Sequence, residues 1–120
     1  MVSEQPVRRL TDILDNISRI RRHTRGMDET TFRRSEIAID AVERCFERIA
    51  EAMRKLGNRY DTLYPDLGLK GLRDFGSVLR HDYESIEPAR LWEFVTEDLE
   101  RLEAMARAEL AKLTEKGDGA

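Results

Sequence analysis

Residues 6–25 read PVRRLTDILDNISRIRRHTR, and their apolar side chains recur at steps of three and four residues. This spacing places the apolar side chains on one side of an α-helix and leaves the rest of its surface polar. Gly26 follows directly and suits the left-handed conformation that often ends a helix. The sequence therefore predicts an amphipathic helix from about Pro6 to Arg25. Its apolar stripe comprises Val7, Leu10, Ile13, Leu14, Ile17 and Ile20.

Three more segments show helical spacing. After a connector at 27–34, in which Phe32 is expected to fill the core, a second helix is predicted over 35–56, with Ser35 as its N-cap and Gly57 as its stop. A turn or short helix ending ahead of Pro65 leads to a third helix over 69–81. The last helix begins near Pro88, which is well tolerated in a first helical turn. It carries Leu91, Trp92, Val95, Leu99, Leu102, Met105 or Ala106, Leu110 and Leu113.

These segments predict an all-α fold, most simply an antiparallel bundle of four helices. The chain has 120 residues, of which 40% are apolar, 7 are Gly and 3 are Pro. That apolar fraction is too high for a disordered chain, and so few breakers argue against an all-β domain. We expect a single domain over 1–115 and a frayed C-terminal tail over 116–120.

Several function classes are disfavoured by composition. The apolar runs are too short to span a membrane, and no secretion signal begins the chain, so we expect a cytoplasmic protein without membrane contact. Cys45 is the single cysteine and falls on an apolar stripe, where an inert buried thiol is expected. The two histidines, His23 and His81, do not have metal-ligand spacing. We therefore expect neither a metal site nor a cofactor.

Positive charge is concentrated near the N-terminus. Residues 1–34 hold 8 basic and 5 acidic side chains, whereas residues 84–120 hold 5 and 10. The densest basic stretch contains Arg19, Arg21, Arg22 and Arg25. Such a stretch suits a surface that binds a polyanion, and it equally suits a solvated helix face rich in arginine.

The end of the third helix offers the most chemistry. Arg73, Ser77 and His81 are spaced by four residues and share one helical face. An Arg and a His suffice for RNA cleavage without a metal, because the His can move a proton at the 2′-hydroxyl or the leaving oxygen while the Arg holds the phosphate. Tyr83 could stack on a base. The alternative is a His that interacts with the helix dipole and a Tyr that fills a core edge.

The order of seven short blocks, spread from Arg9 to Leu110, resembles the HepT-like branch of the HEPN superfamily. The blocks are LTDILDNI at 10–17, DAVER at 40–44, IAEA at 49–52, LYP at 63–65, RHDY at 80–83, LWEFV at 91–95 and EDL at 97–99.

This resemblance implies a bundle of four or five helices that forms a homodimer, with two Arg…His motifs at a shared cleft. It implies a ribonuclease toxin whose antitoxin is a nucleotidyltransferase of the MntA type, which would attach AMP to Tyr83. RNA would be the substrate and His81 the general acid or base, with Ser77 and Asp82 as candidate substrate contacts.

One position departs from the family pattern. The family places an Arg five residues before the His, followed by Asn or Asp, but Gly76 and Ser77 stand there. Arg73 and Arg80 are the available substitutes for the phosphate clamp. Replacing Gly76 with Arg is expected to raise activity unless the cleft has closed over the site.

Three interpretations stay open at this point. The first is an RNA-cleaving toxin. The second is a catalytically weak or inactive HEPN module that binds nucleotide, RNA or a nucleotidyltransferase partner. The third is a structural bundle that pairs with a partner through its helix faces.

Overall fold

The computed structural model describes residues 4–81 and 87–119, with side chains for 5–77 and 87–115. The helices are α1 (Glu4–His23), α2 (Glu29–Arg33), α3 (Glu36–Leu56), α4 (Leu69–His81), α5 (Pro88–Glu93) and α6 (Leu99–Gly119). A 3-10 turn, η1 (Pro65–Leu67), precedes α4, and a π-helical segment, η2 (Phe94–Asp98), joins α5 to α6. The described residues contain no strand, which confirms the all-α prediction.

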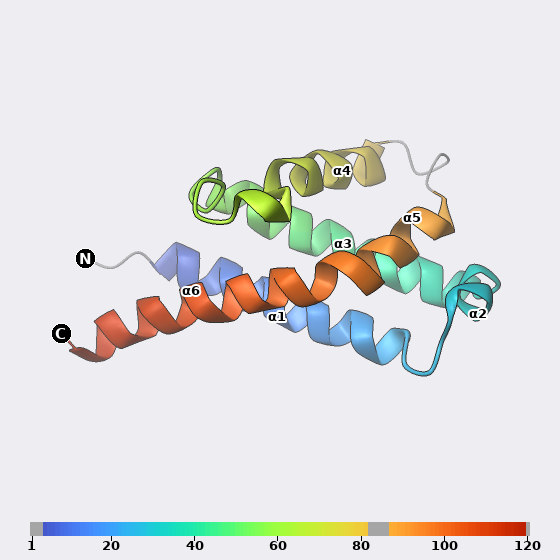
Figure 1. Ribbon diagram of the computed structural model, residues 1–120, viewed down its shortest axis with the longest axis horizontal. Helices are drawn as coiled ribbons and strands as arrows, with labels where there is room; N and C mark the ends of the chain where they lie inside the picture. Colours follow the sequence, from blue (N-terminus) through green and yellow to red (C-terminus); the bar gives the residue numbers. More distant parts are fainter. Residues whose placement is uncertain (1–3, 82–86, 120) are drawn as a thin grey trace.

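The long helices alternate in direction along an elongated molecule of 50 × 28 × 22 Å (Figure 1). α1 packs against α3 and α6, whereas α4 packs mainly on α3. The short α2 turns the chain between α1 and α3 and contacts α5. The architecture is therefore the predicted antiparallel bundle, with α4 as an outer helix held chiefly by its contact with α3.

The helix ends follow the local signals in the sequence. The Ser35 side chain accepts a hydrogen bond of 3.1 Å from the Ala38 N–H, and Gly57 ends α3 with a φ of +70° that favours glycine. Pro88 is the first residue of α5, as predicted. As predicted, the turn that follows α3 ends ahead of Pro65, and a separate 3-10 turn, η1, begins at this proline. The fixed φ of proline suits the first residue of a helical turn.

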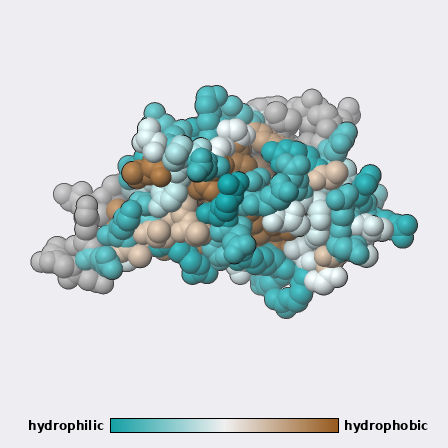
Figure 2. Space-filling model, in the orientation of Figure 1, coloured by the Kyte–Doolittle hydropathy of each residue, from teal (hydrophilic) through white to brown (hydrophobic). Residues whose placement is uncertain are grey.

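Aromatic contacts join the helices at the centre of the core. Phe32 is completely buried, as predicted, and its ring lies 5.1 Å from that of Trp92. Phe46 of α3 packs against Phe94 at 4.2 Å and Phe75 at 5.1 Å. Burying such a side chain contributes about 1.5–3 kcal/mol. Polar side chains cover most of the face in Figure 2, and hydrophobic atoms show in a patch near its middle.

The π-helical segment explains an inward residue that periodicity missed. The last helix was expected to bury Val95, but Phe94 is fully buried and Val95 only partly. The Leu99 N–H donates to the Phe94 carbonyl, five residues back, instead of four as in an α-helix. This wider turn lets Phe94 and Leu99 both face the core, which a uniform period of 3.6 residues does not predict.

None of the helices in the described part of the chain combines the length and apolar character that a bilayer crossing needs. The backbone of α6 continues to Gly119, and its side chains are described as far as Glu115. The expected domain limit at 115 and the frayed tail stay predictions.

α4 approaches α3 closely at Gly76. A Cβ atom added to Gly76 would lie 2.1 Å from the Cβ of Ala50, far inside van der Waals contact. The Ala50 methyl group is bonded directly to the backbone and cannot rotate away, so the helices would have to separate. An arginine at position 76 would meet the same obstacle, and we expect Gly76→Arg to destabilise the fold.

We predict that Gly76→Ala lowers the free energy of unfolding by about 1–3 kcal/mol, because it overpacks the α3–α4 contact. Gly71→Ala is the matched control in the same helix, since a Cβ there meets nothing within 4 Å. It is expected to be neutral or to stabilise by up to about 1 kcal/mol through helix propensity. Urea unfolding of both variants measures the difference, and equal effects would contradict the close contact.

Candidate active site at the end of helix α4

α4 carries most of the residues that the sequence singled out. Arg73, Ser77 and His81 lie on this helix at intervals of one turn or slightly more, and His81 is its last residue. The side chains of Arg80 and His81 lie outside the described ones, and Asp82 and Tyr83 lie outside the described residues. Their meeting at a catalytic site therefore stays a prediction.

Arg73 is held by the turn that follows α3. Its two terminal nitrogens donate to the two Asp61 carboxylate oxygens at 2.9 and 2.8 Å, and one also donates to the Gly57 carbonyl at 3.1 Å. The Arg73 side chain is only 17% exposed. The hydrogen bonds from Arg73 lower the pKa of the Asp61 carboxyl below its ordinary value of 3.8. This bidentate pair fastens the first half of α4 to the end of α3.

The ion pair limits what Arg73 can do for catalysis. Eight residues separate it from His81, which is about 12 Å along the helix axis. Both terminal nitrogens are already committed to Asp61 and Gly57. A phosphate at Arg73 would have to displace or share the Asp61 carboxylate.

Ser77 is exposed beside a small depression at the α3–α4 contact. The depression has a volume of about 20 Å³ and is lined by Glu47 and Glu51 of α3 as well as Arg73, Gly76 and Ser77. A cavity of this volume holds about one water molecule, so a nucleotide does not fit there. The structure thus brings Arg73 and Ser77 together without a substrate-sized cavity between them.

Arg90 is a basic residue near α4 that the sequence analysis did not single out. Its guanidinium lies 5.0 Å from the centre of the Phe75 ring, a cation–π contact that crosses from α5 to α4. It also contacts the Glu93 carboxylate at 3.4 Å. Fifteen residues separate Arg90 from Phe75 in sequence, so local spacing carried no signal of this contact.

The Tyr-Pro block has a structural role. The Tyr64 hydroxyl donates a 2.6 Å hydrogen bond to Glu109 of α6, and Lys112 donates to the same oxygen at 2.9 Å. The bond to Glu109 raises the pKa of Tyr64 to about 12. Burial acts to raise the pKa of Glu109, but the two hydrogen bonds outweigh it and lower that pKa. This network fastens the α3–α4 connection to α6.

Metal ligands do not cluster in the part of the chain that the structure describes. No group of three or more His, Cys, Asp or Glu side chains there is placed to hold a metal ion. The Cys45 thiol is buried, and burial raises its pKa. It therefore has the environment of an inert thiol.

The family model for "Ribonuclease HepT-like" matches residues 13–109, which include α4 and the helices that pack around it. The chain belongs to the HepT-like family.

Several curated relatives come from Methanocaldococcus jannaschii. The protein named "Putative RNase MJ1380" is 29% identical over 93 residues, covering 78% of this chain and 85% of the relative. "Putative RNase MJ0125" is 32% identical over 84 residues, covering 70% and 72%. A third, "Gamma-glutamylcyclotransferase and putative RNase MJ0434", is 28% identical over 109 residues, covering 91% of this chain but 47% of that protein. No solved structure matches the chain significantly.

We predict that Asp61→Asn destabilises the protein at neutral pH and has a shrinking effect in acid. The pKa of Asp61 is lower in the folded state than in the unfolded state. The ionised carboxylate therefore stabilises the fold fully at a pH well above 3.8, and this stabilisation is lost as the pH falls through the pKa of the folded state. Urea midpoints of wild type and variant, measured from neutral pH down to about pH 2, should converge at the acid end. A constant difference across this range would contradict the role assigned to the ion pair.

Proposed function

We propose that this HepT-like protein is a metal-independent endoribonuclease and the toxin of a toxin–antitoxin pair. The observation that carries the proposal is that a match to a ribonuclease family spans residues 13–109, which include all of α3 and all of α4, the helix that ends at His81. His81 acts as general acid or base, and a guanidinium from Arg80, Arg73 or Arg90 holds the scissile phosphate. Ser77 and Asp82 contact the substrate.

The reaction needs only groups that the RNA and the protein supply. The 2′-oxygen attacks the adjacent phosphorus while the bond from phosphorus to the 5′-oxygen breaks. The products are a 2′,3′-cyclic phosphate and a 5′-hydroxyl. One proton leaves the 2′-hydroxyl and one reaches the 5′-oxygen, and His81 is placed at one or both transfers. The arginine offsets the negative charge that grows on the phosphate oxygens.

The proposal includes two protein partners. A second copy of the chain completes the site by bringing another His81 to a shared cleft near the end of α4. A nucleotidyltransferase of the MntA type acts as antitoxin and attaches AMP to Tyr83, two residues from His81. A bulky, charged adenylyl group there would block RNA from reaching His81.

A catalytically weak or inactive module is the second candidate, and two observations favour it. Ala50 occupies the space beside Gly76, where the resemblance places the motif arginine. Arg73, one of its substitutes, is tied to Asp61. In this alternative the protein binds nucleotide, RNA or the nucleotidyltransferase without cutting RNA.

We predict that His81→Ala abolishes both RNA cleavage and the growth arrest that expression of the chain causes. Of the arginine variants, Arg80→Ala should reduce cleavage by about 10²–10³, the typical loss of a transition-state electrostatic contact. Cleavage is also measured for Arg73→Ala and Arg90→Ala. Because Arg73→Ala loses the ion pair with Asp61, its free energy of unfolding is measured as well. All assays contain EDTA, in which cleavage is expected to persist.

Arg107→Ala is the control, since Arg107 lies on α6 and its only described contact is an exposed pair with Glu103. It should cleave RNA at the wild-type rate. If all three α4 and α5 arginine variants cleave normally while His81→Ala is inactive, the clamp assignment is wrong. Wild-type protein that neither cleaves RNA nor arrests growth supports the binding module instead.

We predict that the chain is a homodimer in solution. Light scattering after size exclusion should give twice the 14.0 kDa chain mass at micromolar concentration. A single species of 14.0 kDa would contradict the shared cleft.

A further inference from the structure

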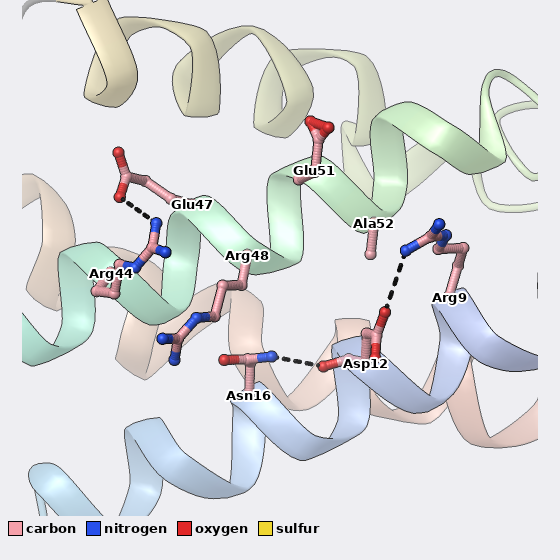
Figure 3. A pocket seen from close by; sticks show the side chains of 8 residues that line it. All are labelled: Arg9, Asp12, Asn16, Arg44, Glu47, Arg48, Glu51 and Ala52. Atoms are coloured by element: carbon pink, nitrogen blue, oxygen red, sulfur yellow. Dashed lines mark hydrogen bonds and ion pairs between the residues drawn. The ribbon is translucent and has the colours of Figure 1, made fainter.

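A second hollow of the described surface lies between α1 and α3. It is a groove with a volume of about 430 Å³ (Figure 3). Arg9 and Asn16 line it from α1, and Arg48 lines it from α3. Its volume lies within the range of small-molecule sites, whereas the depression beside Ser77 does not.

Two buried polar atoms at the groove have no hydrogen-bond partner. Asn16 is only 7% exposed, and its amide nitrogen donates to the Asp12 carbonyl at 2.9 Å, which leaves Oδ1 unpaired. The Nε of Arg9 is also buried and unpaired. A buried polar atom without a hydrogen-bond partner destabilises the folded chain. Both residues line the groove, so one unpaired acceptor and one unpaired donor lie within its wall.

Three arginines and three carboxylates line the groove, but their pairing is uneven. Arg9 pairs with Asp12 and Arg44 with Glu47, both at 3.4 Å. Glu51 pairs with Arg54. Arg48, by contrast, makes no ion pair or hydrogen bond with the described residues, and its guanidinium extends from α3 toward Asn16 (Figure 3).

Two α1 arginines add to the positive charge of Arg48. Arg19 and Arg22 follow Asn16 by about one and two turns and likewise make no ion pair with any described residue. Burial raises the pKa of Cys45, but the charges of Arg48, Arg19 and Arg22 all act to lower it. Of these three arginines, Arg48 lines the groove itself, and Arg19 and Arg22 belong to α1, the helix that forms its other wall.

We infer that the α1–α3 groove binds a nucleotide of a single-stranded RNA, with phosphates at Arg48, Arg19 and Arg22 and the base or ribose at Asn16 and Arg9. Phosphate oxygens at neutral pH are predominantly acceptors, so a phosphate alone does not satisfy Asn16 Oδ1. A base edge or a 2′-hydroxyl supplies the missing donor. The inference rests on the proposed action on RNA.

The groove lies on the other side of α3 from the depression beside Ser77. Glu47 and Glu51 line both the groove and the depression beside Ser77, so only α3 separates the two. An RNA held by the groove would pass around α3 to the helix that carries His81. The groove would thus act as a binding subsite beside the cleavage site.

The test measures binding of a fluorescent oligouridine of about 10 nucleotides to the full chain. His81→Ala serves as the parent protein, so that binding is measured without cleavage. Arg48→Gln should raise Kd about tenfold and reduce the slope of log Kd against log salt by about 0.7, because one phosphate contact is lost. Arg34→Gln is the matched control, as Arg34 is exposed and lies outside the groove. It should change Kd much less.

The variant Asn16→Leu distinguishes the contribution of base or ribose hydrogen bonds to RNA affinity from the contribution of charge. It removes the unpaired acceptor without changing net charge, so Kd should rise several-fold while the salt slope stays constant. The free energy of unfolding should not fall, because an unsatisfied buried polar group is replaced by an apolar one.

Each of three outcomes would overturn the inference. The first is an equal Kd for Arg48→Gln and Arg34→Gln, and the second is no binding of RNA by the parent at low salt. The third is loss of the dimer in both groove variants. Failure of the inference is distinguishable from failure of the proposed ribonuclease. If the parent binds RNA through Arg48 and Asn16 but wild type cleaves none, the groove stands and the enzyme does not. If wild type cleaves RNA but neither variant alters binding, the enzyme stands and the groove does not.

Discussion

The contact between Gly76 and Ala50 fixes how α4 lies on α3, and the candidate active site depends on it. A hydrogen atom at position 76 allows the two backbones to approach until an added Cβ would be 2.1 Å from that of Ala50. Phe75 can then pack on Phe46, and Arg73 reaches Asp61 on the turn after α3. His81, at the end of the same helix, is positioned by these contacts.

The same contact also bears on catalysis, because Gly76 stands at the position of the family's motif arginine. Where the resemblance expects a catalytic arginine, the helix uses a glycine to pack against its neighbour. In the proposed ribonuclease, a guanidinium for the phosphate would come from elsewhere on α4 or from α5. The bidentate pair with Asp61 gives Arg73 a structural role. In our inference, the groove between α1 and α3 offers RNA a second point of attachment.

Features set by local sequence were predicted well. Helical spacing and capping residues placed α3 and α4 to within a residue, and Phe32 was correctly assigned to the core. Phe94 was missed because a π-helical turn changes the period, and no residue in that stretch signals it. The sequence could show that Gly76 departs from the family pattern, but not that Ala50 fills the space beside it.

Contacts between distant segments set most of the site. The Arg73–Asp61 pair, the Arg90–Phe75 contact and the groove at Asn16 each join elements that only the fold brings together. The sequence analysis identified the Arg-rich stretch of α1, but not Arg48 on the neighbouring helix α3. The roles of His81, Arg80, Asp82 and Tyr83 stay predictions, because their side chains lie outside those the structure describes.

A double-mutant cycle between positions 50 and 76 tests the central contact most directly. Unfolding free energies are measured for wild type, Gly76→Ala, Ala50→Gly and the double variant. If α4 rests on α3 as described, Ala50→Gly makes room for the new methyl group. The double variant should then be more stable than the sum of the single effects by about 0.5–3 kcal/mol. Additive effects would show that the two residues do not touch, and would contradict the placement of α4 and of the site it carries.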